Sequence, residues 1–97
     1  MQLDQLTPED FEALRGQTLA LEAPAARIVC TLIEVRRLPA HGLRTAPPFA
    51  LTLRGPLTPV LAQGTYRLDH PVHGPLALFA VPIGPDAEGM RYEVTFN

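Results

Sequence analysis

His70 and His73 have a His-x-x-His spacing, which raises the question of a pair of metal ligands. A structural zinc ion needs four ligands, and the other candidates are Asp69, next to the pair, and Cys30, in a distant apolar segment. Pro71 lies between the histidines and indicates a turn. We therefore expect these imidazoles to cap the turn or to face solvent, with no metal and no other cofactor.

Nucleophilic catalysis has few possible participants in this chain. It contains no serine and no lysine, which excludes Ser-His-Asp hydrolysis and Schiff-base chemistry. The single cysteine, Cys30, cannot form an intrachain disulfide, and it lies in the apolar run 28–33. Burial there would raise its pKa and keep the thiol inert, so a Cys-His pair is the weaker alternative.

Two pairs of carboxylates, Glu9 with Asp10 and Asp86 with Glu88, could serve acid–base chemistry only inside a desolvating pocket. No such pocket is indicated by the sequence. Asp86 lies in the turn-rich segment 84–89 and is expected to bond its own turn backbone. We predict that the protein is not an enzyme.

The candidate binding residues are polar side chains at strand ends and in loops. Arg54 closes one predicted strand, Gln63 precedes the next, and His70 ends that one. His41 lies in the stretch 39–48, the longest without periodicity, which we expect to be a surface loop. If these residues line a common groove, they would contact a partner or ligand.

The composition indicates one globular domain, residues 1–97, with no nucleic-acid partner. Hydrophobic residues make up 46% of the chain, too many for a disordered protein. The net charge is −2, and the eight arginines are scattered rather than clustered, so no positive surface is available for phosphates. The acidic, polar start resembles no signal peptide, and no run is long enough to span a membrane; we expect a cytoplasmic protein.

The elements that must position these residues are one helix and about six strands. Thr7 and Pro8 predict a helix over about 8–15, which Gly16 ends. Period-two alternation and flanking proline and glycine predict the strands. Their expected ranges are 17–22, 27–38, 49–54, 65–69, 76–83 and 90–96.

These strands predict a mainly β fold with one short N-terminal helix, in which antiparallel strands form a small barrel or a sandwich. Short connections favour up-and-down neighbours. The second strand, 27–38, could contain a bulge. The fifth, 76–83, is apolar on both faces and should be the most buried, whereas the last, 90–96, should present a free edge.

Three motifs in the second half of the chain are specific: Gln-Gly-x-Tyr at 63–66, Val-Pro-Ile-Gly-Pro at 81–85 and Tyr-Glu-x-x-Phe-Asn at 92–97. Through these motifs, and over nearly its whole length, the chain resembles a family of small bacterial proteins that is described only as a domain of unknown function. The resemblance implies no activity or catalytic residue. It further implies genes nearby that encode proteins similar to phage tail collars, and hence a role in an assembly.

Two hypotheses of function follow. The first is a non-catalytic interaction or accessory module of a bacterial assembly, which binds another protein or itself, because catalytic sets are missing and the last strand offers an edge. The second is a small-ligand-binding β-barrel, because closed sheets can enclose a cavity.

Overall fold

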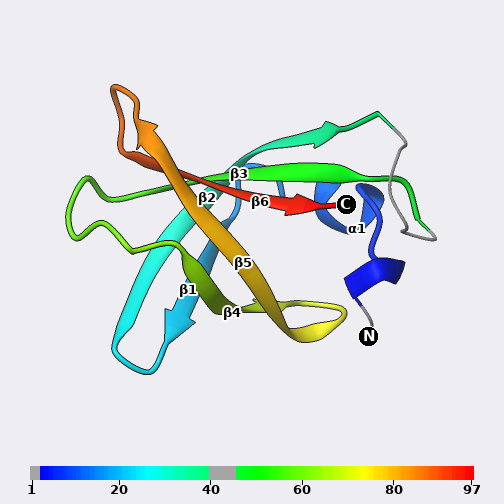
Figure 1. The fold of residues 1–97 in the computed structure, drawn as a ribbon, viewed down its shortest axis with the longest axis horizontal. Helices are drawn as coiled ribbons and strands as arrows, with labels where there is room; N and C mark the ends of the chain where they lie inside the picture. Colours follow the sequence, from blue (N-terminus) through cyan, green and yellow to red (C-terminus); the bar gives the residue numbers. More distant parts are fainter. Residues whose placement is uncertain (1–2, 40–45) are drawn as a thin grey trace.

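The computed structural model describes residues 3–39 and 46–97 and shows a six-stranded antiparallel barrel with one short α-helix (Figure 1). The predicted fold class is therefore confirmed, and the sheet closes rather than splitting into a sandwich. A 3-10 turn η1 (Leu3–Gln5) and helix α1 (Glu9–Glu12) precede the strands. The strands are β1 (Thr18–Ala23), β2 (Ala26–Arg37), β3 (Phe49–Gly55), β4 (Gly64–His70), β5 (Gly74–Pro85) and β6 (Met90–Phe96).

The order of strands around the barrel is β1-β2-β3-β6-β5-β4. Four connections join neighbouring antiparallel strands, as predicted, but β3 and β4 are not adjacent. The chain crosses instead from β3 to a position beside β1, which gives the spatial order 4-1-2-3 of a Greek key. The prediction of up-and-down neighbours is wrong at this one connection.

The free edge predicted for the last strand is absent, because β6 pairs with β3 on one side and with β5 on the other. A closed sheet leaves no strand available for edge-to-edge pairing. The junction between β1 and β4 is the thinnest part of the barrel, since only Glu22 and Arg67 are in register there.

Helix α1 is shorter than the predicted 8–15 and covers one end of the barrel (Figure 1). Asp10 Oδ2 accepts the backbone N–H of Thr7 at 2.8 Å, so an aspartate takes the role that glutamate has in a capping box. Phe11 is fully buried, and the centroid of its ring lies 5.9 Å from that of Phe49 and 5.7 Å from that of Phe96. The helix thus closes the aromatic end of the core.

Strand β5 is not the most buried strand, contrary to the prediction. Its residues alternate between buried and exposed, and Phe79 and Ile83 are 53% and 40% exposed. No second layer covers the outside of the barrel at these positions, so only the inward face of β5 is buried. The most buried strand is β3, where six of seven residues are buried.

The crossover between β3 and β4, residues 56–63, is held to the barrel by two tyrosines. The hydroxyl oxygen of Tyr92 accepts the backbone N–H of Leu61 at 2.9 Å, and both residues are buried. The hydroxyl of Tyr66 donates to the carbonyl of Ala62 at 2.6 Å. Both bonds fix the segment that makes the fold a Greek key.

Candidate functional site

The candidate site is a polar groove on the outside of the barrel. Its volume is about 430 Å³, and it extends over β2, β3 and β6 to the end of β5. The lining residues are Ile33, Glu34, Arg36, Thr52, Arg54, Ile83, Asp86, Arg91 and Glu93. Charged side chains therefore form most of the surface, with one isoleucine from β2 and one from β5.

Both isoleucines lie at irregularities in the sheet. Between β2 and β3 the register shifts around Ile33, and between β5 and β6 it shifts around Ile83. The first shift lies within the predicted second strand and confirms the bulge there. A bulge redirects side chains and increases local twist. These two shifts give the outside of this antiparallel barrel a hollow at this place.

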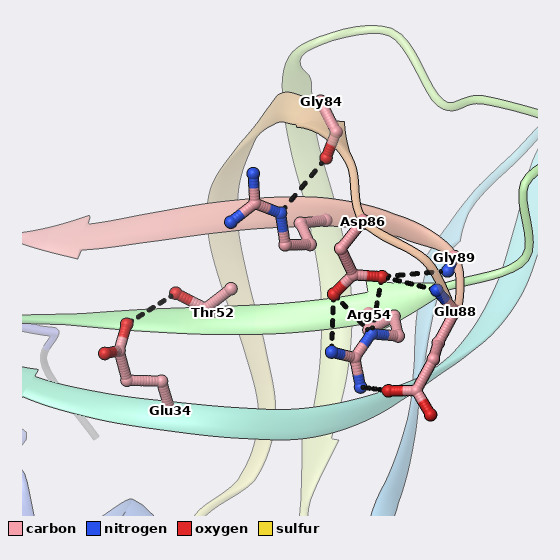
Figure 2. Close-up of polar contacts among 8 residues, drawn as sticks. Glu34, Thr52, Arg54, Gly84, Asp86, Glu88 and Gly89 are labelled. Carbon is pink, nitrogen blue, oxygen red and sulfur yellow. Dashed lines mark hydrogen bonds and ion pairs between the residues drawn. The ribbon is translucent and has the colours of Figure 1, made fainter.

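The most extensive contact in the groove joins Arg54, at the end of β3, to Asp86, in the β5–β6 loop (Figure 2). Arg54 Nε lies 2.9 Å from Asp86 Oδ2, and Nη2 lies 2.5 Å from the same oxygen. Arg54 Nη1 also lies 3.3 Å from a carboxylate oxygen of Glu88. The hydrogen bond from Arg54, helped by backbone N–H groups, lowers the pKa of Asp86 from 3.8 to about 2.

Asp86 also organises its own loop, as predicted. Its Oδ1 accepts the backbone N–H groups of Glu88 and Gly89 at 2.8 and 3.0 Å (Figure 2). Gly89 is needed because a Cβ there would lie only 2.2 Å from the carbonyl oxygen of Gly55. The loop can therefore approach β3 closely enough for Asp86 to reach Arg54.

A second cluster crosses β3 farther along the groove. Arg36, on β2, lies 3.2 Å from carboxylate oxygens of both Glu34 and Glu93, although β2 and β6 are separated by β3. Glu34 Oε1 accepts the hydroxyl of Thr52 at 3.1 Å (Figure 2). These long side chains cover the small outward residues of β3, which explains why that strand is buried on both faces.

Arg91, on β6, differs from the other groove arginines because its only described partner is a backbone carbonyl. Its Nε donates to the oxygen of Gly84 at 3.3 Å. Gly84 has a φ of +106°, a conformation that side-chain-bearing residues rarely adopt. The register shift in β5 and this glycine thus place the Gly84 carbonyl beside Arg91.

The structure brings only one of the predicted binding residues, Arg54, into the groove. Its carboxylate partners there are Asp86 and Glu88. Gln63 is exposed in the β3–β4 crossover and does not line the groove. His41 lies outside the described residues.

His70 lies at the other end of the barrel, beneath α1, and is 5% exposed. Its Nδ1 accepts the backbone N–H groups of Val72 and His73 at 3.1 and 3.2 Å, which confirms its turn-capping role. Its Nε2 is 2.7 Å from the carbonyl oxygen of Asp10, and this contact ties the helix to the β4–β5 turn. Both ring nitrogens are therefore engaged with backbone groups.

The neighbouring His73 Nε2 lies 3.0 Å from Asp10 Oδ1. Burial opposes ionisation of Asp10, but hydrogen bonds from His73 and Thr7 outweigh it, and its pKa is lowered. Among residues 3–39 and 46–97, no three His, Cys, Asp or Glu side chains gather in a way that could hold a metal ion. His70 and His73 thus connect elements of the fold.

Cys30 is 1% exposed, as its apolar neighbours predict, and burial raises the pKa of its thiol to about 11. A Cys-His nucleophilic pair has no geometric support, because the thiol lies in the core and His70 is bonded to backbone. Within the part of the chain that the structure describes, no helix is long and apolar enough to cross a membrane.

The comparison with known families agrees with the resemblance seen in the sequence. The family called domain of unknown function DUF6916 matches residues 6–96, from before α1 to the end of β6. The chain belongs to this family. No curated protein and no solved structure matches it. The DUF6916 match therefore covers the whole barrel and the groove, but assigns no chemistry to either.

Sequence reasoning missed Arg91 and the partnership of Arg54 with Asp86 in this DUF6916 chain. The alternation in 90–96 does place Arg91 on the outward face. The alternation cannot predict which residue lies across the sheet from Arg91, because that depends on the pairing of β3 with β6. A usable signal was the break in alternation at Pro82, Ile83 and Gly84, which is typical of a bulge.

Proposed function

We propose that the protein is a non-catalytic protein-binding module, an accessory component of a bacterial assembly such as a tail-like structure. The observation that carries the proposal is the apolar outer face of β5. Phe79 and Ile83 are 53% and 40% exposed, Ala77 is also exposed, and Val81 is half-buried. Exposed contiguous apolar side chains on a folded protein are typical of contact surfaces.

The outer face of β5 also connects two hollows. Ile83 lines the polar groove, and Phe79 lines an apolar hollow of about 270 Å³ near the end of β6. A partner bound to the outer face of β5 would contact apolar side chains at the centre and the charged side chains of the groove at one side. An apolar centre with a polar rim is the usual composition of a protein interface. The free edge that first suggested binding is absent, so contact through side chains replaces strand addition in the proposal.

The alternative of a small-ligand-binding barrel gains no comparable support. The inward positions of the strands carry large side chains that are fully buried, among them Leu21, Leu32, Leu53, Leu68 and Tyr92. Small barrels are filled by such side chains, whereas ligand-binding barrels leave a cavity between them.

The test is site-specific photocrosslinking in the native host, with a photoreactive amino acid at position 79 or at position 29. Val29 is the matched control, because it is 49% exposed but lies on β2. We expect one protein, or a second copy of this chain, to crosslink from position 79 and not from position 29. Phe79→Ser with Ile83→Ser should remove that complex while circular dichroism shows that the barrel stays folded. Equal crosslinking from both positions would contradict the proposal.

A further inference from the structure

Arg91 is the one arginine of the described residues that has no carboxylate within ion-pair distance. Eight arginines occur in the chain, and Arg44 lies outside the described ranges. Six of the other seven lie within 3.4 Å of an aspartate or glutamate oxygen: Arg15, Arg27, Arg36, Arg37, Arg54 and Arg67. Arg91 is half-buried and contacts only the carbonyl of Gly84.

The lack of an acidic partner matters because another arginine lies directly across the sheet. Arg91 on β6 is in register with Arg54 on β3. Like charges at such a position destabilise a sheet unless something neutralises them. Asp86 and Glu88 form ion pairs with Arg54, whereas no carboxylate in the described residues forms one with Arg91. The three arginines and three carboxylates that line the groove balance in number, but Arg91 is the arginine among them without a direct ion pair.

The geometry of Arg91 suits a planar anion. Its Nε is occupied by Gly84, which restrains the guanidinium and leaves both terminal nitrogens available. Two parallel N–H groups match the two oxygens of a carboxylate. A carboxylate is favoured over a doubly charged phosphate because Glu34, Asp86 and Glu93 already line the groove and would repel the larger charge more strongly.

The walls of the groove indicate the kind of molecule that carries this carboxylate. Ile83 lines the groove and is continuous along β5 with the exposed Phe79. A bound carboxylate at Arg91 would thus have apolar surface beside it. We infer that Arg91 binds an aspartate or glutamate side chain of a partner protein, flanked there by apolar residues that lie on β5. This inference rests on the proposed function.

The test is a titration of the ¹⁵N-labelled protein, followed by NMR through the Nε–H signal of Arg91 and, in every variant, through the backbone N–H signals of Ile83 and Glu93 in the groove. The probes are the capped peptides acetyl-Leu-Asp-Leu-amide and acetyl-Leu-Asn-Leu-amide, together with acetate and inorganic phosphate. We expect the Asp peptide to shift the Arg91 signal saturably and more tightly than acetate. Because a charge-assisted hydrogen bond is lost, the Asn peptide and the Arg91→Gln variant should each bind roughly tenfold more weakly or worse. Arg15→Gln, at an exposed position after α1 and outside the groove, is the matched control and should keep the wild-type affinity.

Three results would overturn the inference: no saturable shift, equal shifts with the Asp and Asn peptides, or tighter binding of phosphate than of the Asp peptide. The Phe79→Ser variant separates this outcome from failure of the proposed function. If acetate still shifts the Arg91 signal in that variant and the Asp peptide no longer binds more tightly than acetate, both proposals are supported. If the Asp peptide still binds more tightly than acetate by the wild-type factor, the carboxylate site is supported and the proposed role of β5 is contradicted.

Discussion

The hydroxyl oxygen of Tyr92, in the core of the barrel, accepts the backbone N–H of Leu61 at 2.9 Å. Tyr92 is fully buried and Leu61 is 5% exposed, so water cannot easily replace the phenol. The bond joins β6 to the crossover that carries the chain from β3 to β4. A core tyrosine thus helps to fix the one connection in the barrel that is not a hairpin.

Tyr92→Phe should destabilise the protein by about 1–3 kcal/mol, because it leaves a buried N–H without an acceptor. The measurement is the free energy of unfolding in urea. Tyr66→Phe is the matched control: Tyr66 bonds the carbonyl of Ala62, an exposed residue, so water can take over its role. A loss as large in Tyr66→Phe as in Tyr92→Phe would contradict this explanation.

Acid should weaken the fold between about pH 4 and pH 2 through Asp86. The pKa of Asp86 is about 2 in the folded protein against an ordinary value of 3.8, so the unfolded chain binds more protons in this window. The contribution of Asp86 to the free energy of unfolding is therefore present above its pKa in the unfolded chain. It is lost as the pH falls through its pKa in the folded protein. Asp86→Asn keeps the loop acceptor but should flatten this part of the stability curve, measured by urea unfolding at each pH. Arg54→Gln should flatten it as well; an unchanged slope in both variants would count against the ion pair.

Gly89→Ala should be costly although Gly89 does not have a positive φ. The added Cβ would lie 2.2 Å from the carbonyl oxygen of Gly55, so the loop must move away from β3. Overpacking of this kind costs roughly 1–3 kcal/mol. Gly64→Ala is the control, since its nearest contact would be an ordinary 3.9 Å to the ring of Tyr66. Thermal unfolding should separate the two, and equal melting temperatures would show that the loop adapts freely.

Cys30 should react very slowly in the folded protein. With a pKa of about 11, only roughly one thiol in a thousand is ionised at pH 8, and the residue is 1% exposed. Because the chain has one cysteine, the absorbance change with Ellman's reagent reports this site alone. We expect fast reaction in guanidinium chloride and slow reaction without it. Rapid reaction of the native protein would revive the Cys-His alternative.

Local sequence patterns were enough to place the strands, but not to order them. The alternation in 90–96 predicts β6 with its observed bounds, because period-two burial depends only on neighbouring residues. The pairing of β3 with β6 depends on a crossover that no local pattern encodes. The exposure of Phe79 was likewise unpredictable, since it depends on the absence of a covering layer.

The groove could be predicted only in part. Arg54 stands out in the sequence as a charged residue at a strand end, and Asp86 as a turn residue. Their meeting requires the close approach that Gly89 permits, which is a three-dimensional fact. The opposition of Arg54 and Arg91 likewise follows from sheet register and cannot be seen in the spacing of the chain.

The thin junction between β1 and β4 also bears on how the chain reaches this structure. Glu22 and Arg67, the pair in register there, are 45 positions apart, and Arg67 Nη2 lies 2.5 Å from Glu22 Oε1. Contacts between distant positions form late, because the entropy of loop closure must be overcome before they stabilise anything. We expect folding in milliseconds to seconds, with Arg67→Gln accelerating unfolding far more than it slows folding in stopped-flow measurements. Closure of the barrel at this junction would then be a late step of folding and an early step of unfolding.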